Sequence, residues 1–228
     1  MTTDRGSDLV RRAAREWWPN LPMLLVGSIA VAAGWAMLRS VAAGSGWVAL
    51  LGIGVLVIPL LAGVLDGCLR LLDDQHVGAL HLVRRLPTVV VRSWRVTGPV
   101  TLVALLTDAA AVAWQRGGQP WMLVSLGICT AVLLGLVFVG VIALPYVLRS
   151  RAGVRETWLV GAFLATRHPV LVVGVLSACG VAVWAAAHLS FALLILLPAP
   201  LALIWAAAAS EANLRGRVRL AGGGRQLA

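Results

Sequence analysis

The most informative pattern in this chain is a series of long apolar stretches separated by short arginine-bearing segments. A helix needs about 20 apolar residues to cross a bilayer. Six stretches come close to that length or exceed it, at 21–38, 47–65, 99–114, 121–148, 169–187 and 189–209. The last two are separated only by the region around His188 and Ser190, which we interpret as a tight turn. The pattern predicts six transmembrane helices.

The connecting segments on one side also carry a helical pattern. Apolar residues alternate with arginines at helical spacing in 9–18, 75–95 and 153–167. Such segments are typical of short helices that lie at the membrane interface, with their arginines among the lipid headgroups. The expected fold is all-α: a polytopic membrane bundle of six transmembrane helices arranged as three hairpins, with short cytoplasmic amphipathic helices. Its parts are a cytoplasmic amphipathic segment (1–20), one six-helix domain (21–210) and a basic, disordered cytoplasmic tail (211–228).

Composition supports this interpretation and excludes others. Of the 228 residues, 60% are apolar and 12% are charged, and the mean hydropathy is +0.92. Soluble domains have about half apolar and a quarter charged residues. The three cysteines have no metal-binding spacing, and we expect Cys68, Cys129 and Cys179 to be packing residues. The composition excludes a soluble globular protein, a disordered chain and a disulfide scaffold.

The distribution of arginine predicts the orientation. All 19 basic residues are arginines, and 17 of them lie before the first, between the second and third, between the fourth and fifth, or after the sixth predicted span. Only Arg39 and Arg116 lie on the other side. Because cytoplasmic loops are enriched in positive charge, both termini are expected in the cytoplasm. We expect a multi-pass protein of the cytoplasmic membrane that contacts anionic headgroups, with Arg84, Arg85, Arg92 and Arg95 as anchors, and no nucleic-acid partner.

Prolines and tryptophans recur within the predicted hairpins. Pro22, Pro99 and Pro169 open the odd spans, where a first-turn proline costs no hydrogen bond. Pro59, Pro145 and Pro198 lie inside the even spans and predict kinks. The ten tryptophans form belts near the two interfaces, Trp158 and Trp205 in the inner one, which is typical of membrane anchoring. Gly63 and Gly67, four residues apart, favour close helix packing.

Few residues suggest chemistry. Asp108 is the one clear acid within a span, and it is interpreted either as a structural polar contact, to Arg116, His188 or Arg39, or as a proton or substrate site. Asp66, Asp73, Asp74 and His76 could hold a metal ion, although an Asp66–Arg70 ion pair accounts for the first of them more simply. No catalytic motif is present. We expect no enzyme activity, no catalytic or metal-binding residue and no cofactor.

Several local motifs resemble one family. They are Trp18-Pro19-Asn20-Leu21, Ser93-Trp94-Arg95, Leu144-Pro145-Tyr146 and the helix around Trp158 and Phe163. On these motifs the chain resembles the YesL-like family of small integral membrane proteins, a domain of unknown function, over about residues 17–212. Family members are often described beside carbohydrate ABC-transporter components, and no catalytic residues are established for them.

Two functions follow as hypotheses. The first is an accessory or assembly protein of a carbohydrate ABC-type uptake system, with Arg155, Glu156, Trp158 and Phe163 as its docking face and transporter subunits as partners. The second is a small secondary transporter or channel that uses Asp108. An enzyme of lipid chemistry would need metal binding at Asp66 to His76 and is a distant third.

Overall fold

The protein is helical throughout the part that its computed structural model describes, which is residues 20–42, 44–73, 79–150, 152–188 and 196–223. Within 79–81, 185–188 and 211–223 only the backbone is described. These ranges contain no strand. The elements, in chain order, are α2 (Leu21–Val41), α3 (Gly46–Gly52), the π-helix η1 (Ile53–Val57), α4 (Ile58–Leu72), α5 (Ala79–Gly117), α6 (Pro120–Arg149), α7 (Val154–Arg167), α8 (Pro169–His188) and α10 (Pro198–Gly223).

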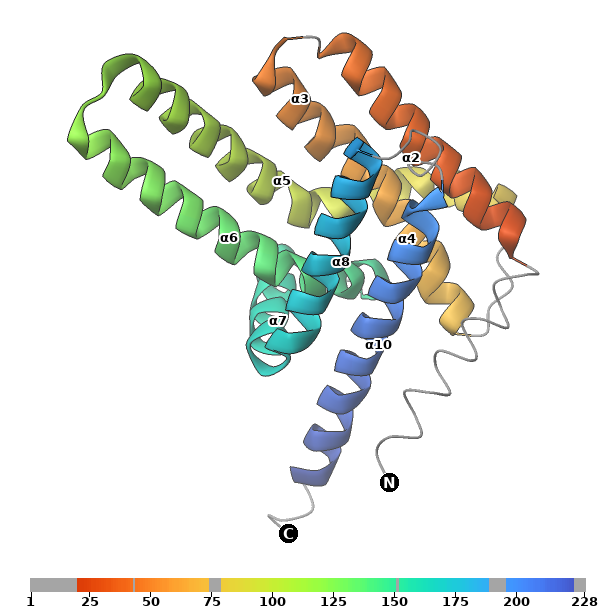
Figure 1. The fold of residues 1–228 in the computed structure, drawn as a ribbon. Coiled ribbons are helices and arrows are strands. Elements are labelled where there is room, and N and C mark those ends of the chain that lie inside the picture. The colour runs from red at the N-terminus through yellow and green to blue at the C-terminus, as the bar shows by residue number, and fades with distance from the viewer. Residues whose placement is uncertain (1–19, 43, 74–78, 151, 189–195, 224–228) are drawn as a thin grey trace.

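The helices converge at one end and spread apart at the other (Figure 1). The turns that join α2 to α3 and α5 to α6 lie at the spread end, whereas α7 lies across the base of the bundle. The buried core is formed mainly by α4, α6 and α10, through residues such as Leu65, Leu69, Ile142, Val147 and Ala206. Packing is therefore concentrated where the helices converge.

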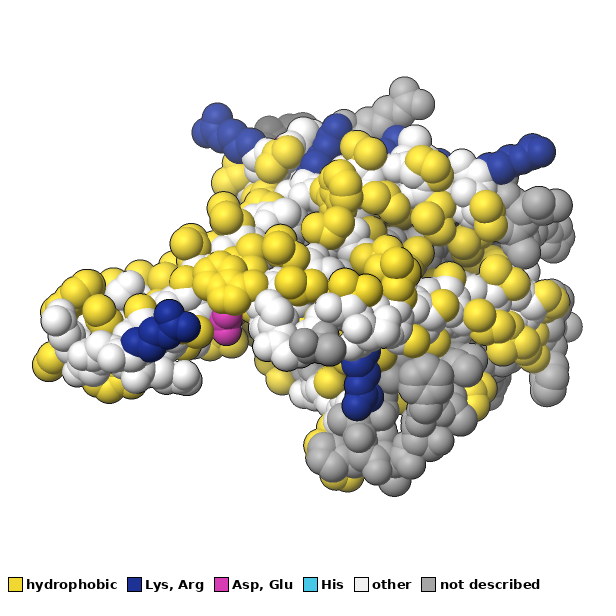
Figure 2. Space-filling model, turned by 90° about the horizontal axis from the view of Figure 1, so that it is seen from above, with side chains coloured by type: hydrophobic (Ala, Val, Ile, Leu, Met, Phe, Trp, Pro, Cys, Tyr) yellow, Lys and Arg dark blue, Asp and Glu magenta, His cyan; other side chains and the backbone are white. Residues whose placement is uncertain are grey.

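The outer surface of the spread helices is apolar. Seen from above, apolar side chains are spread over much of the visible face, and the arginine side chains lie mainly near its edges (Figure 2). Only 17% of the most apolar stretch of α6 is buried, compared with 44% in α2. Exposed apolar surface of this extent marks a protein that meets another apolar phase. The α5–α6 arm is thus suited to contact with lipid.

Four described helical segments are long and apolar enough to cross a membrane: α2, the continuous rod Gly46–Leu72, Leu82–Gly117 of α5, and α6. The pair formed by α7 and α8 passes the same test only when taken together, and it is bent by 99°. The apolar start of α10, Pro198–Ser210, is shorter. The expected all-α fold is confirmed, with four to five candidate spans in the described part of the chain.

The predicted separation of an interfacial helix at 75–95 from a span at 99–114 is wrong. Both belong to α5, a single helix of 39 residues that contains Pro87 and Pro99. The second predicted span, 47–65, likewise continues to Leu72. Proline at position 99 does not end the helix because a neighbouring helix replaces the hydrogen bond that it removes, as shown below.

Three expectations concern the ends of the chain and one connection. The tail 211–228 was expected to be disordered; α10 extends to Gly223, 224–228 lie outside the described residues, and the expectation stays a prediction. The amphipathic N-terminal segment lies almost wholly outside the described residues, which begin at residue 20. The turn expected around His188 and Ser190 falls in 189–195, also outside them.

A π-helical turn accompanies Pro59 within the rod formed by α3, η1 and α4. The N–H of Ile58 bonds to the carbonyl of Ile53, five residues back. Such wider turns relieve a helix that has lost a donor to proline. Gly54, in the same turn, faces Thr101 of α5: a Cβ at this glycine would lie 2.8 Å from the Thr101 Cβ. The glycine is needed for this close approach of the two helices.

Candidate functional site

A tryptophan replaces the hydrogen bond that Pro145 removes from α6. In an α-helix the carbonyl of Val141 would accept from the N–H of residue 145, and proline has none. The indole Nε1 of Trp205, on α10, donates to this carbonyl at 2.6 Å. The Trp205 side chain is buried. Its interpretation as a membrane anchor is wrong, because it ties α10 to the weak point of α6.

A tryptophan also replaces the hydrogen bond that Pro99 removes from α5. The carbonyl that it leaves without a partner is that of Arg95, and the indole Nε1 of Trp158 on α7 donates to this oxygen at 3.3 Å. Pro99 was expected in a first turn, where it would cost no hydrogen bond, but it lies inside α5. Trp158 was expected on a docking face; its side chain is half-buried, with the indole N–H directed at α5. Two proline sites thus bind neighbouring helices through indole groups.

The helix α7 is held tightly against α6. Thr157, Gly161, Leu164 and Ala165 form its buried face. At Gly161 the approach is closest, since a Cβ there would lie 2.8 Å from the Cβ and 3.2 Å from the Cα of Ala143. Together with Trp158, these contacts fix the position of α7 on the bundle.

The opposite face of α7 is exposed and mixed in character. Leu159 and Phe163 are 61% and 54% exposed. The guanidinium of Arg167 lies over the Phe163 ring, 4.7 Å from its centroid, a cation–π arrangement. Arg155 and Glu156 are exposed at the other end of the helix, and the hydroxyl of Tyr146 donates to Glu156 at 3.3 Å. Of the four predicted docking residues, all but Trp158 lie on the outer surface.

The expected headgroup anchors divide into two kinds. Arg92 donates to the carbonyl of Leu148 at 3.4 Å, and Arg95 to that of Ala152 at 3.0 Å. The last carbonyls of a helix lack partners within it and carry partial negative charge, so Arg92 caps the end of α6. These two arginines thus bond to the protein itself, and their interpretation as lipid anchors stays a prediction. Arg84 is exposed.

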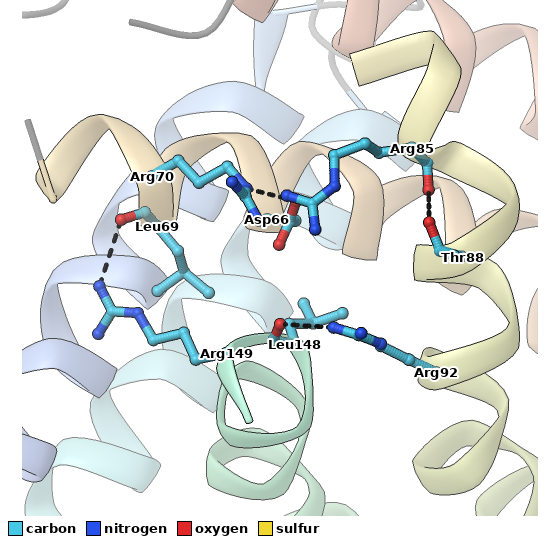
Figure 3. A network of polar contacts seen from close by, with 8 residues as sticks. All are labelled: Asp66, Leu69, Arg70, Arg85, Thr88, Arg92, Leu148 and Arg149. Carbon is cyan, nitrogen blue, oxygen red and sulfur yellow. Dashed lines mark hydrogen bonds and ion pairs between the residues drawn. The ribbon is translucent and has the colours of Figure 1, made fainter. Parts of the chain in front are cut away.

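An ion-pair network joins α4, α5 and α6 at the base of the bundle (Figure 3). Asp66 accepts from Nε of Arg70 at 3.0 Å, which confirms the predicted pair, and its Oδ2 lies 3.9 Å from the Arg85 guanidinium. Arg149 binds Asp73 at 2.8 Å and donates to the Leu69 carbonyl at 3.2 Å.

The remaining residues of the expected metal cluster, Asp74 and His76, lie outside the described residues. Among the described ones, no three His, Cys, Asp or Glu side chains come together as a metal site would require. The network was missed by sequence reasoning because Arg85 and Arg149 are distant in the chain from their acids. Only the i, i+4 spacing of Asp66 and Arg70 gave a signal.

Asp108 lies beside the beginning of the rod Gly46–Leu72. A Cβ at Gly46 would be 3.8 Å from its Oδ2, and the side chain is half-buried. Among the described side chains no ion pair to Asp108 is formed, either from Arg39 or from Arg116. A carboxylate near a helix N-terminus is stabilised by the partial positive charge there, which favours the structural interpretation.

The cysteines and glycines that were expected to act in packing lie within or between the helices. Cys68 is buried in the core, Cys129 and Cys179 are half-buried, and all three are free thiols. A Cβ at Gly63 would meet Leu86 of α5 at 3.5 Å, and one at Gly67 would lie 3.4 Å from Leu82. At Gly67 an added Cβ would also overlap the Met23 side chain, so this glycine favours the close approach of α4 to α2, whereas the contacts toward α5 are of ordinary van der Waals length.

These observations define a class: an all-helical protein with several apolar helices suited to a membrane, whose polar contacts at the base of the bundle join its helices. Comparison with protein-family models, with curated proteins and with solved structures finds no match. The resemblance to the YesL-like family therefore stays a prediction.

Proposed function

We propose that the protein crosses the cytoplasmic membrane six times, as three hairpins with both termini in the cytoplasm. The four long apolar segments supply four crossings. The 20 residues of α8 and the apolar start of α10 supply the other two. The arginines support the orientation, since Arg70, Arg85, Arg92 and Arg149 all belong to the base of the bundle. Positive charge of this kind favours the cytoplasmic side.

Single cysteines at the two ends of α5 test this orientation. The variants Arg84→Cys and Arg116→Cys are made in a protein whose native cysteines are replaced by alanine; both positions are exposed. We expect a membrane-impermeant maleimide to label position 116 in intact spheroplasts and position 84 only after permeabilisation. Labelling of position 84 in intact spheroplasts contradicts the orientation, and labelling of both contradicts the crossing by α5.

We further propose that the protein is a non-enzymatic accessory or assembly protein that docks to a partner through the outer face of α7. The observation that carries this proposal is that a firmly held helix presents two exposed apolar side chains, Leu159 and Phe163, between charged groups. Interfaces use such a pattern: an apolar centre and a charged rim on a rigid support. The resemblance to the YesL-like family supports a subunit of a carbohydrate ABC-type transporter as the partner, and the proposal requires no cofactor.

Affinity purification from the native host in mild detergent tests the docking face. The variant Leu159→Ser/Phe163→Ser is expected to recover at least about tenfold less of an ABC permease or its ATPase than the unchanged protein, because loss of two central contacts costs more than 1.4 kcal/mol. Val173→Ser/Val181→Ser is the matched control, since these α8 side chains are 53% and 66% exposed. Equal recovery with both double variants, or no transporter subunit with the unchanged protein, contradicts the proposal.

The alternative is a small secondary transporter or channel based on Asp108. The position of Asp108 beside Gly46 explains the acid without a transport role, so this alternative has less support. One substitution distinguishes the two functions. If the protein acts by docking, Asp108→Asn is expected to leave partner recovery unchanged. A pH-dependent flux into liposomes that this substitution abolishes would favour the transporter.

A further inference from the structure

The base of the bundle carries more positive than negative charge at one small site. Four guanidinium groups, those of Arg70, Arg85, Arg92 and Arg149, surround the ends of α4 and α6 (Figure 3). In the described part of this network they face two carboxylates, Asp66 and Asp73. Among the described side chains, the arginines of this network thus outnumber its carboxylates.

Arg85 is the member best placed to bind a further anion. Its guanidinium lies 3.9 Å from Asp66 Oδ2, which is ion-pair distance but too long for a hydrogen bond. Its side chain is 31% exposed, and its planar donors suit the oxygens of a phosphate. Among the described contacts, its guanidinium donates no hydrogen bond.

The space in front of Arg85 is shaped as a pocket. It is lined by Asp66 and Arg70 on α4 and by Arg85 on α5, with small or apolar residues completing the wall: Gly63, Gly67, Leu82 and Val89. Arg70 and Arg85 both line this space, so an anion at its mouth can lie near both guanidinium groups.

We propose that this pocket binds a phosphate group, with Arg70 and Arg85 as its ligands. Asp66 holds the two guanidinium groups together in the absence of the anion. The inference goes beyond the docking function, but it rests on the proposed placement of this end at the cytoplasmic interface, where anionic lipids concentrate. The lipid headgroup and free phosphate share this chemistry, and the experiment distinguishes them.

Native mass spectrometry and thermal melting of the full-length protein in neutral detergent test the site. The probes are phosphatidylglycerol, phosphatidylcholine and inorganic phosphate. We expect phosphatidylglycerol to remain bound and to raise Tm, with phosphatidylcholine bound at least tenfold more weakly. If inorganic phosphate raises Tm equally, the phosphate site stands and its ligand is the free ion. If none of the three has an effect, the proposal is overturned.

Two neighbouring arginines provide the matched comparison. Arg85→Gln is expected to weaken phosphatidylglycerol binding by at least about tenfold, because it removes a charged, planar donor from the phosphate. Arg84→Gln removes the same charge from the adjacent, exposed position and is expected to change binding less than twofold. Equal losses would mean a diffuse charge effect and would overturn the site.

A third variant, which is expected to strengthen binding, distinguishes loss of the site from loss of folding. Asp66→Asn removes the carboxylate that competes with the anion for Arg70 and Arg85. We expect phosphatidylglycerol or phosphate to bind this variant several-fold more tightly. A purely structural network predicts no gain, so unchanged or weaker binding by folded Asp66→Asn would overturn the proposal. If the maleimide experiment contradicts the proposed orientation while these binding results are obtained as expected, only the orientation is overturned.

Discussion

Replacement of Trp205 by phenylalanine is expected to lower the free energy of unfolding by about 1–3 kcal/mol, the cost of leaving a buried acceptor unsatisfied. The indole is the group that donates to the Val141 carbonyl, and Pro145 supplies no N–H to replace it. Phenylalanine keeps the aromatic body and loses only the donor and part of the volume. Reversible unfolding in mixed micelles, followed by circular dichroism, measures the loss.

The proline itself offers the decisive control. In a Pro145→Ala background the N–H of residue 145 can bond to the Val141 carbonyl, so Trp205→Phe is expected to cost much less. The difference between the two backgrounds is the coupling energy of a double-mutant cycle. An equal cost in both backgrounds would mean that Trp205 acts through its bulk and that the hydrogen bond contributes little.

Gly161→Ala is the second substitution with a large expected effect. The added Cβ would lie 2.8 Å from the Ala143 Cβ and 3.2 Å from its Cα. Since the obstacle includes backbone, no change of rotamer relieves the overlap, and α7 must move away from α6. Overpacking of this kind costs about 1–3 kcal/mol. We expect the same unfolding experiment to show this loss, together with weaker partner recovery, because the docking face moves with α7.

Two further variants distinguish steric overlap at position 161 from the general effect of replacing glycine by alanine in a helix. Gly174→Ala, on α8, meets no atom within 4 Å and is expected to be neutral or to stabilise the helix by about 0.5–1 kcal/mol. Ala143→Gly removes the nearest obstacle and is expected to recover part of the stability of Gly161→Ala. No recovery would show that the strain arises elsewhere.

The sequence predicted the helical, membrane-suited class well because hydropathy over 20 residues is a strong, local signal. It failed at α5, where Pro99 was taken as a helix start. A proline pattern alone does not reveal whether a donor from a distant segment restores the missing bond, and here the donor is Trp158, which lies 63 residues after Arg95, the residue whose carbonyl accepts.

The polar contacts at the base of the bundle also include some that the sequence predicts and others that it does not. The Asp66–Arg70 pair is four residues apart and was predictable. Arg92 and Arg149 donate to backbone carbonyls near helix ends, which any residue type could supply, and Arg149 also pairs with Asp73, far from it in the chain. Only the packing of α4, α5 and α6 decides which carbonyls lie within reach, so these contacts leave no pattern in the sequence.

The proline–indole contacts also have a consequence for sequence change over time. Val141 contributes its backbone carbonyl to the contact with Trp205, so this hydrogen bond does not depend on the side chain at position 141, whereas positions 145 and 205 constrain each other. A chain that loses the proline first keeps its stability when it later loses the tryptophan; the reverse order passes through a weakened intermediate. We therefore expect covariation between positions 145 and 205, and between 99 and 158, with aromatic donors lost only where the proline is already absent.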